Sequence, residues 1–312
     1  MTATETWEFW LGSPWMLALL GLVVGSFLNV VIHRMPRMLE RQWWGEVAGQ
    51  LGDGESHRRV FGQDIPPSFA EHARAVEQRL EALPVLGLAR PASRCPACGH
   101  RIRWFENIPV LSWLVLRARC SACRAPISAR YPAVELLTAA LFALVGWRFG
   151  ASVATLLWCS AVAVLLVLAM IDWDTTVLPD SLTLPLMWAG LLAAFAGWLP
   201  PLSAAESLIG AVAGYLSLWT VYWVFKLATG KEGMGYGDFK LLAALGAWLG
   251  WQALLPIVLL ASGIGAVVGL ALKASGGLRE GRYVPFGPFL AGGGVAVMGL
   301  GLPRVLAWMG WA

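Results

Sequence analysis

Apolar residues run along the chain in long blocks that shorter polar stretches separate. Most blocks are long enough to cross about 30 Å of hydrocarbon as a helix that rises about 1.5 Å per residue. The blocks cover residues 14–32, 132–149, 152–171, 183–199, 203–228, 238–250, 252–272 and 287–310. The pattern therefore predicts an all-α integral membrane protein with about eight transmembrane helices, of which the short 238–250 is tilted or partly re-entrant.

A large polar insertion follows the first block. His33 and Arg34 are expected to stop the first span, and the insertion extends from there over residues 33–131. Within the insertion, residues 38–82 are expected to form charged helices over part of their length. Residues 93–130 contain cysteines and are expected to consist mostly of loops. The predicted organisation has three parts: an N-terminal transmembrane anchor at 1–32, a loop domain at 33–131 and a seven-helix membrane domain at 132–312.

The composition excludes a soluble globular protein. Hydrophobic residues make up 58% of the chain and charged residues 13%, whereas soluble domains carry about 25% charged residues. Glu5 and Glu8 stand where a cleavable secretory signal would be basic, so the first span is expected to remain as an anchor. Since no basic face with interleaved aromatic residues is present, membrane lipid and not nucleic acid is the expected surrounding.

The distribution of positive charge predicts the orientation of the helices. With eight crossings, 21 of the 23 lysines and arginines lie on the side of residues 33–131, and only Arg148 and Arg304 lie opposite. Cytoplasmic segments are enriched in lysine and arginine, so residues 33–131 are expected in the cytoplasm. The opposite face collects tryptophans, as the lipid–water boundary does: Trp147, Trp198, Trp251, Trp308 and Trp311.

Two aspartates at the edges of apolar blocks are the candidate catalytic residues. Asp172 lies in IDWDTTVLPD at 171–180, and Asp238 lies in GMGYGDFK at 233–240. The predicted topology places both at the same boundary of the membrane, where an ionisable residue is a functional hypothesis by default. Two adjacent carboxyl groups share a proton, so that one activates water while the other donates to a carbonyl oxygen. The pair predicts a membrane aspartic endopeptidase.

Each aspartate also has a purely structural interpretation. Asp238 is placed well for a helix N-cap. Asp172, Asp174 and Asp180 together are compatible with a solvated acidic loop. The chemistry of the residues alone does not select Asp172 over Asp174 or Asp180 as the partner of Asp238.

Four cysteines form two similar segments, CPACGHRI at 95–102 and CSACRAPI at 120–127. Their spacing is C-x2-C-x21-C-x2-C, close to the usual four-cysteine zinc pattern. Closed tetrahedral sites of this kind are structural. Two disulfides, or His100 in place of one cysteine, are the alternatives, and Cys159 is expected to be a core residue in the third span. The predicted ligands of a structural Zn²⁺ ion are Cys95, Cys98, Cys120 and Cys123.

A few further polar residues lie in or beside the spans. Glu135 lies one turn into the second span, where it either tunes the aspartates or binds a substrate amine, or is simply an interfacial polar residue. Asn29 and His33 either cap the first span or contact substrate. The glycine-rich stretch 291–301 has no preceding strand, so it is expected to serve helix packing and not nucleotide binding.

These motifs resemble those of the bacterial type IV prepilin peptidases, also called prepilin leader peptidase/N-methyltransferases. The resemblance covers nearly the whole chain and keeps the motifs in order. It rests on GSFLNVVIHRMP at 25–36, the paired CxxC segments, ENIPVLSWL at 106–114, ISARYPAVELLTA at 127–139, IDWDTTVLPD, GMGYGDFK, and VPFGPFL at 284–290.

The resemblance implies a specific activity. Such enzymes of the bacterial inner membrane remove the basic leader of prepilins and pseudopilins after a glycine, at the cytoplasmic face, and methylate the new N-terminus with S-adenosylmethionine. Their catalytic aspartates match Asp172 and Asp238 here, and their four-cysteine loop accompanies the methyltransferase activity. The alternatives are a peptidase without methylation and a non-enzymatic transporter or assembly scaffold with a zinc module. Nothing in the sequence specifies an oligomeric state.

Overall fold

The computed structural model describes residues 12–276 and 284–311, which fall into two compact units. One unit is a helical bundle that comprises Met1–Leu28 and Ala129–Ala312, and the other is a loop unit, Asn29–Ser128. The predictions for Glu5 and Glu8, and for Arg279 and Arg282 among the 21 basic residues expected on the side of residues 33–131, fall outside the described residues.

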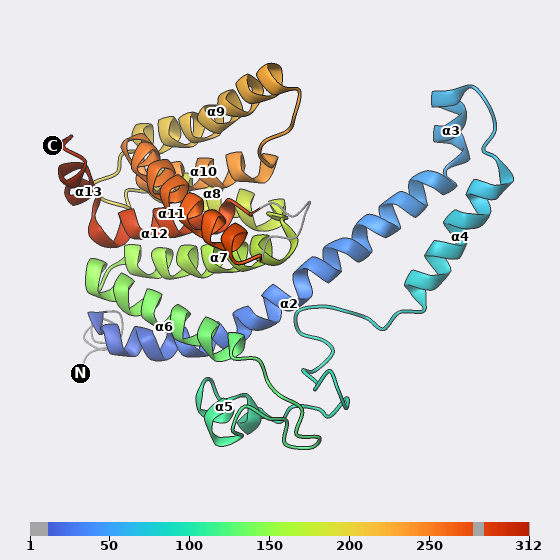
Figure 1. The fold of residues 1–312 in the computed structure, drawn as a ribbon, viewed down its shortest axis with the longest axis horizontal. Helices are drawn as coiled ribbons and strands as arrows, with labels where there is room; N and C mark the ends of the chain where they lie inside the picture. Colours follow the sequence, from blue (N-terminus) through green and yellow to red (C-terminus); the bar gives the residue numbers. More distant parts are fainter. Residues whose placement is uncertain (1–11, 277–283, 312) are drawn as a thin grey trace. The chain divides into compact units, whose positions relative to one another are not determined.

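The described part of the bundle is built from helices only (Figure 1). Apart from two isolated bridges in the loop unit, the described residues form no strand pairing. The helices are the first half of α2 (Pro14–Gly52), α6 (Arg130–Phe149), α7 (Val153–Thr175), α8 (Asp180–Phe195), α9 (Ala204–Thr229), α10 (Tyr236–Leu249), the 3-10 turn η2 (Trp251–Ala253), α11 (Leu254–Ala274), α12 (Gly287–Leu300) and α13 (Leu302–Trp308). The loop unit holds the second half of α2 together with α3 (Gly54–Phe61), α4 (Pro67–Glu81), the 3-10 turn η1 (Trp104–Asn107) and α5 (Leu111–Val115).

The predicted all-α membrane fold is confirmed. Each predicted span coincides with helix, and five helices of the described chain are long and apolar enough to cross a membrane, or six if the bent pair α12–α13 is one span. The helices α8 and α10 have 16 and 14 residues and are shorter than a full crossing. The prediction of a short span at 238–250 therefore matches a short helix.

Two predicted boundaries differ from the structure. The last span breaks at Gly301, where φ is 86° and the two helices bend by 104°. Glycine tolerates this positive φ, and Pro303 lies in the first turn of the new helix α13. The sequence predicts that the first span stops at His33 and Arg34, but α2 continues through Pro36 to Gly52. Polar side chains end an apolar surface, but they do not end helical hydrogen bonding.

The short helix α10 lies at the centre of the bundle, where it packs against α8, α9 and α12. Phe239, Leu241 and Leu242 have no exposed surface. The closest packing is between α9 and α10, because a Cβ atom added to Gly210 would lie 2.2 Å from the carbonyl oxygen of Gly246. Small residues at such a crossing allow two helix backbones to approach.

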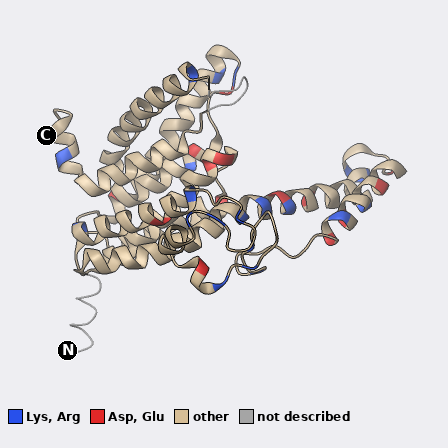
Figure 2. Cartoon of the chain, turned by 60° about the horizontal axis from the view of Figure 1, so that its bottom comes forward, with Lys and Arg blue, Asp and Glu red and all other residues tan. Residues whose placement is uncertain are grey.

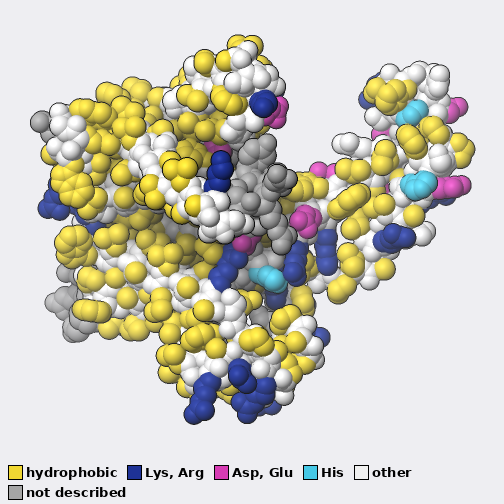
Figure 3. Space-filling view, in the orientation of Figure 1, with side chains coloured by type: hydrophobic (Ala, Val, Ile, Leu, Met, Phe, Trp, Pro, Cys, Tyr) yellow, Lys and Arg dark blue, Asp and Glu magenta, His cyan; other side chains and the backbone are white. Residues whose placement is uncertain are grey.

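Charged side chains are sparse on the bundle and gather near the ends of its helices (Figure 2). Hydrophobic side chains cover most of its visible face, while basic side chains gather on the part of the loop unit around α5 (Figure 3). This distribution suits a bundle that is surrounded by hydrocarbon and a loop unit that is in water.

The close α9–α10 crossing predicts an unequal response to two matched substitutions. Gly210→Ala should lower the free energy of unfolding by about 1–3 kcal/mol, because the added methyl group overlaps a backbone oxygen. Gly263 also lies within a long helix, but an added Cβ meets nothing within 4 Å. Gly263→Ala should therefore be neutral or stabilise by up to about 1 kcal/mol, the helix-propensity gain.

Thermal unfolding of the full-length protein in detergent measures both changes. Equal melting temperatures for the two variants would contradict the close packing of α9 on α10.

Candidate active site and candidate metal centre

Asp172 lies in the last turn of α7 and is 5% exposed. The helix ends because Thr176 takes the left-handed conformation and its N–H donates to the Asp172 carbonyl oxygen at 2.8 Å. Pro179 follows as the N-cap residue of the next helix, α8. The polar motif after the apolar block thus ends α7 within one turn of the aspartate, and the carboxyl group remains inside the bundle.

Asp238 lies in the first turn of α10 and is 7% exposed. Gly235 is the N-cap residue, and its carbonyl oxygen accepts from the Asp238 N–H at 3.3 Å. Asp238 therefore does not cap this helix, and the N-cap interpretation of the residue is wrong. A buried carboxyl group at this position needs another role.

The fold brings the two carboxyl groups together at one end of the bundle. They are close enough for the charge of Asp172 to act on Asp238. Leu178 connects the two sides, because Cβ atoms added to Gly237, next to Asp238, and to Gly287, next to the Asp172 carboxyl group, would approach its side chain within 2.8 and 3.2 Å. Residues far apart in sequence, from α7, α10 and the start of α12, therefore form one site.

A backbone donor orients Asp172. The Gly287 N–H at the start of α12 donates to Asp172 Oδ2 at 3.0 Å, and a Cβ atom on Gly287 would lie 2.6 Å from that oxygen. Sequence reasoning did not single out Gly287. The VPFGPFL motif could have indicated this donor, because Pro288 is typical of the first turn of a helix. Backbone N–H groups in a first turn have no partner within the helix, so they are available to a side chain.

One oxygen of the second carboxyl group lacks a partner. Among the described residues, Asp238 Oδ1 is the only fully buried side-chain oxygen or nitrogen without a hydrogen bond. Leaving such a group unsatisfied costs about 1–3 kcal/mol. A cost of this kind is typical of a site that awaits a proton, a water molecule or a substrate group.

The two alternative aspartates have other partners. Arg130 donates to both oxygens of Asp174 at 2.8 and 2.6 Å, and Lys240 donates to both oxygens of Asp180 at 2.7 Å. The Asp174 and Asp180 side chains are 35% and 53% exposed. Both are surface ion pairs, whereas Asp172 and Asp238 are buried.

The segment before Asp238 is attached to α9. Lys226 donates to Tyr222 Oη at 3.0 Å and to Glu232 Oε1 at 2.8 Å. The adjacent ammonium group lowers the pKa of the Glu232 carboxyl. The Tyr236 hydroxyl also lies 3.3 Å from the Tyr222 hydroxyl. These contacts position the glycine-rich segment that leads into the candidate site.

The three further polar candidates lie on α6 and α2. Glu135 is buried on α6 where α2 packs closely, since a Cβ atom on Gly25 would lie 2.7 Å from the Glu135 Cα. Asn29 and His33 lie on α2 in the loop unit. The roles of all three residues stay predictions.

In the loop unit, the two cysteine segments form one cluster. One sulfur atom from each of Cys95, Cys98, Cys120 and Cys123 lies within 4.8 Å of the others, and none is in a disulfide. The cluster could hold a metal ion, and four thiolates suit a tetrahedral ion of the zinc type. Cys159, by contrast, is buried on α7.

The two segments have the same backbone turn. The Gly99 N–H donates to Cys95 O, and the Arg124 N–H donates to Cys120 O, at 2.9 and 3.0 Å. Gly99 and Arg124 occupy equivalent positions and both have positive φ, 72° and 61°. The N–H groups of Cys98 and Ala97 lower the pKa of the Cys95 thiol to about 7, which favours the thiolate that binds metal.

Glu106 links the segments through polar contacts. Its Oε2 accepts from the Arg103 N–H at 2.8 Å and lies 3.3 Å from His100 Nε2. Ser121 Oγ lies 3.4 Å from the same imidazole nitrogen. The Arg103 N–H, the Ser121 hydroxyl and His100 lower the pKa of Glu106 to about 2. His100 therefore interacts with Glu106, and the cluster of possible metal ligands in the described chain consists of the four cysteines.

Two protein families match the parts of the chain that contain the candidate sites. The Bacterial Peptidase A24 N-terminal domain matches residues 19–149, and the Type IV leader peptidase family matches residues 159–270. These segments contain the cysteine cluster and both buried aspartates.

Individual relatives are similar to this chain over most of their length. A Prepilin leader peptidase/N-methyltransferase of Pseudomonas putida is 50% identical over 285 residues, which are 91% of this chain and 89% of that protein. Proteins of the same name are 49% identical in Aeromonas hydrophila, over 90% of this chain and 89% of that protein, and 49% identical in Burkholderia pseudomallei, over 92% and 85%. No solved structure matches the chain.

The cysteine cluster predicts a metal content that one pair of substitutions removes. The full-length protein should bind about one divalent ion, and Cys98→Ser with Cys123→Ser should reduce this to near zero, because two ligands cannot close a tetrahedral site. Metal analysis of purified protein measures the ratio.

Cys159→Ser is the matched control, because this thiol lies on α7, away from the cluster, and should leave the metal content unchanged. Full metal retention in the double variant would contradict the cluster as a metal centre.

Proposed function

The chain belongs to the type IV leader peptidase family, and on this premise we propose that it removes the leader of prepilins and pseudopilins and methylates the new N-terminus. The observation that supports cleavage here is the pair of buried carboxyl groups, Asp172 and Asp238, with one oxygen unpartnered. The names of the relatives support both activities.

We propose that Asp172 and Asp238 act as a dyad that shares one proton, since adjacent carboxyl groups cannot both ionise easily. The ionised member removes a proton from water, which attacks the scissile carbonyl carbon. The protonated member donates to the carbonyl oxygen. The resulting tetrahedral intermediate collapses, the C–N bond breaks, and the proton taken from water passes to the leaving amine while the other proton returns to the dyad. Gly287 holds Asp172 Oδ2 as an acceptor, and the unpartnered Asp238 Oδ1 is free to bind the shared proton or the substrate.

The proposed substrate suits this end of the bundle. A prepilin has a basic leader followed by an apolar helix, which would lie among the spans while the leader remains in water. Asp174, Asp180 and Glu232 at this end are each paired with a cation, so the net negative charge there comes from the ionised member of the dyad. That charge attracts a basic leader. We further propose that this end faces the cytoplasm and that the membrane is the bacterial inner membrane.

For the second activity we propose S-adenosylmethionine as the methyl donor. When bound, it supplies an electrophilic methyl group to the new terminal amine. This donor follows from the methyltransferase name of the relatives, and we assign no residue to its binding.

For the loop unit we propose a structural Zn²⁺ ion held by Cys95, Cys98, Cys120 and Cys123. The repeated turns and the four adjacent sulfur atoms support this assignment. Such an ion supplies folding energy to a small loop domain. We retain the division into an anchor at 1–32, a zinc-binding loop at 33–131 and a peptidase domain at 132–312 as a proposal.

A transporter or scaffold is the less favoured function. Transport sites in membrane proteins typically lie near the middle of the bilayer. Asp172 and Asp238 lie instead in the terminal turns of α7 and α10, and the relatives have the names of enzymes.

Replacing either buried aspartate should abolish leader removal. Asp172→Asn and Asp238→Asn each remove a group that transfers protons, so we expect losses of at least about 10²–10⁴-fold in cleavage rate. The assay incubates a prepilin with the full-length protein in membranes and reads the product by mass, which also reports the added methyl group.

Asp174→Asn and Asp180→Asn are matched controls of the same chemistry on surface ion pairs, and each should retain activity within about tenfold, since such pairs contribute little. Normal cleavage by either buried variant would remove that residue from the dyad. Failure of the unmodified protein to cut any prepilin would favour the transporter or scaffold.

A second prediction concerns the donor to Asp172. Gly287→Ala places a methyl group against Asp172 Oδ2 and should lower the cleavage rate by about 10²-fold, the effect of a misplacement of about 1 Å. Gly292→Ala, in the same helix with nothing within 4 Å of the added Cβ, should leave the rate unchanged. Equal rates in the two variants would show that Gly287 does not position Asp172.

A further inference from the structure

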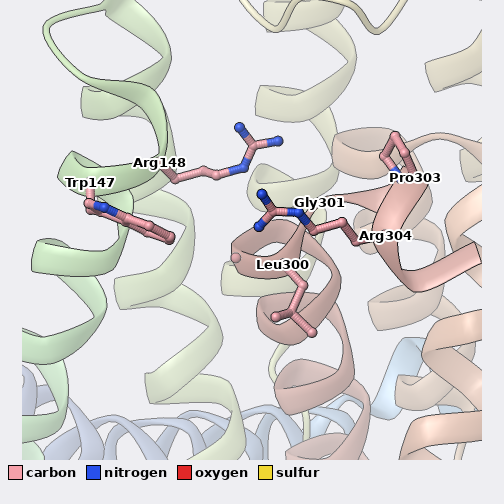
Figure 4. A pocket seen from close by; sticks show the side chains of 7 residues that line it. Trp147, Arg148, Leu300, Gly301, Pro303 and Arg304 are labelled. Atoms are coloured by element: carbon pink, nitrogen blue, oxygen red, sulfur yellow. The ribbon is translucent and has the colours of Figure 1, made fainter. Parts of the chain in front are cut away.

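The only two basic residues that the charge pattern places on the opposite side of the membrane line one pocket. Arg148 comes from the last turn of α6 and Arg304 from α13, and their side chains extend toward one another (Figure 4). Trp147, Leu300 and Gly301 also line this pocket, whose volume is about 330 Å³. The two exceptions to the charge bias therefore form one feature.

The pocket is remote from the aspartates. Gly287 at the first residue of α12 contacts Asp172, whereas the pocket lies at the other end of α12, at Leu300 and Gly301. The 14 residues of α12 span about 21 Å at about 1.5 Å per residue. Likewise, Arg148 precedes the start of α7, and Asp172 lies near its end. The pocket is therefore not part of the peptidase site.

The two arginines give the pocket a positive charge that would attract an anion. No aspartate or glutamate lines it, and within the described residues neither guanidinium forms an ion pair with a carboxylate. Two guanidinium groups that share a pocket repel each other, and both present planar donor pairs that match phosphate oxygens. The Phe149 ring, whose centroid lies 5.6 Å from the Arg148 guanidinium carbon, carries no negative charge that would neutralise this arginine.

The surroundings indicate a lipid source for the anion. Trp147 is 68% exposed, and the other four tryptophans of the predicted boundary belt are exposed as well: Trp198, Trp251, Trp308 and Trp311. Tryptophan at this depth marks the level of the headgroups. Leu300 is 39% exposed beside the arginines, so the pocket wall is apolar where a lipid would continue into its acyl chains.

We propose that Arg148 and Arg304 bind the phosphate of an anionic phospholipid headgroup at the end of the bundle opposite the aspartates. A role for Arg148 at the C-terminus of its own helix, where a cation is favourable, accounts for one arginine. It does not account for the approach of Arg304 to the same pocket from a separate helix.

The test uses the delipidated full-length protein in a neutral detergent, with dioleoyl phosphatidylglycerol as the probe and native mass spectrometry to count bound lipid. Arg148→Gln with Arg304→Gln should weaken binding at least about tenfold, which is about 1.4 kcal/mol. Lys231→Gln with Lys273→Gln is the control, because it removes the same charge from two exposed lysines outside the pocket. It should leave binding unchanged.

Melting temperatures with and without lipid separate a loss of lipid binding from a loss of folding. Added lipid should raise the melting temperature of the unmodified protein but not of the arginine variant, and the melting temperature without lipid checks folding. If the double variant does not fold, Arg304→Gln alone decides, since this side chain is exposed on α13. Equal lipid binding by arginine and lysine variants would overturn the proposal. Displacement of the lipid by millimolar inorganic phosphate would assign the pocket to a free anion and overturn the lipid assignment.

Discussion

The burial of two carboxyl groups at one end of an apolar bundle is the interaction on which the rest of the site depends. A carboxylate removed from water needs a donor, a shared proton or a partner charge. Asp172 has the Gly287 N–H, and Asp238 has an oxygen with no partner among the described residues. Three helices converge at this point and hold the two carboxyl groups in place. In the proposed mechanism, the unpartnered oxygen of Asp238 is the atom that binds the shared proton or the substrate.

The short helix α10 makes this convergence possible. It is surrounded by α8, α9 and α12 and has no exposed surface along most of its apolar side chains. The contact of Gly210 with Gly246 brings α9 against it at backbone distance. Because α10 is fixed along its length, Asp238 in its first turn is held in place, and the polar contacts of Lys226 and Tyr222 position the segment just before it.

Helix α12 joins two polar regions of opposite sign. Its first residue donates to Asp172, and its last residues line the pocket of Arg148 and Arg304. Each charge near hydrocarbon destabilises a membrane protein, so charges persist where a ligand or a reaction uses them. The break at Gly301 serves this arrangement, because the bend turns α13 and brings Arg304 beside Arg148.

The sequence by itself determined the membrane class, the helices, the family resemblance and the cysteine pairs, because apolar length and ligand spacing are local properties. It also selected IDWDTTVLPD and GMGYGDFK as the segments that contain the candidate catalytic residues. Only the tertiary structure decided that Asp174 and Asp180 are in surface ion pairs while Asp172 and Asp238 are buried together. Gly287 and the convergence of Arg148 with Arg304 were likewise out of reach, since a contact between residues distant in sequence depends on how helices pack and not on the spacing within any one of them.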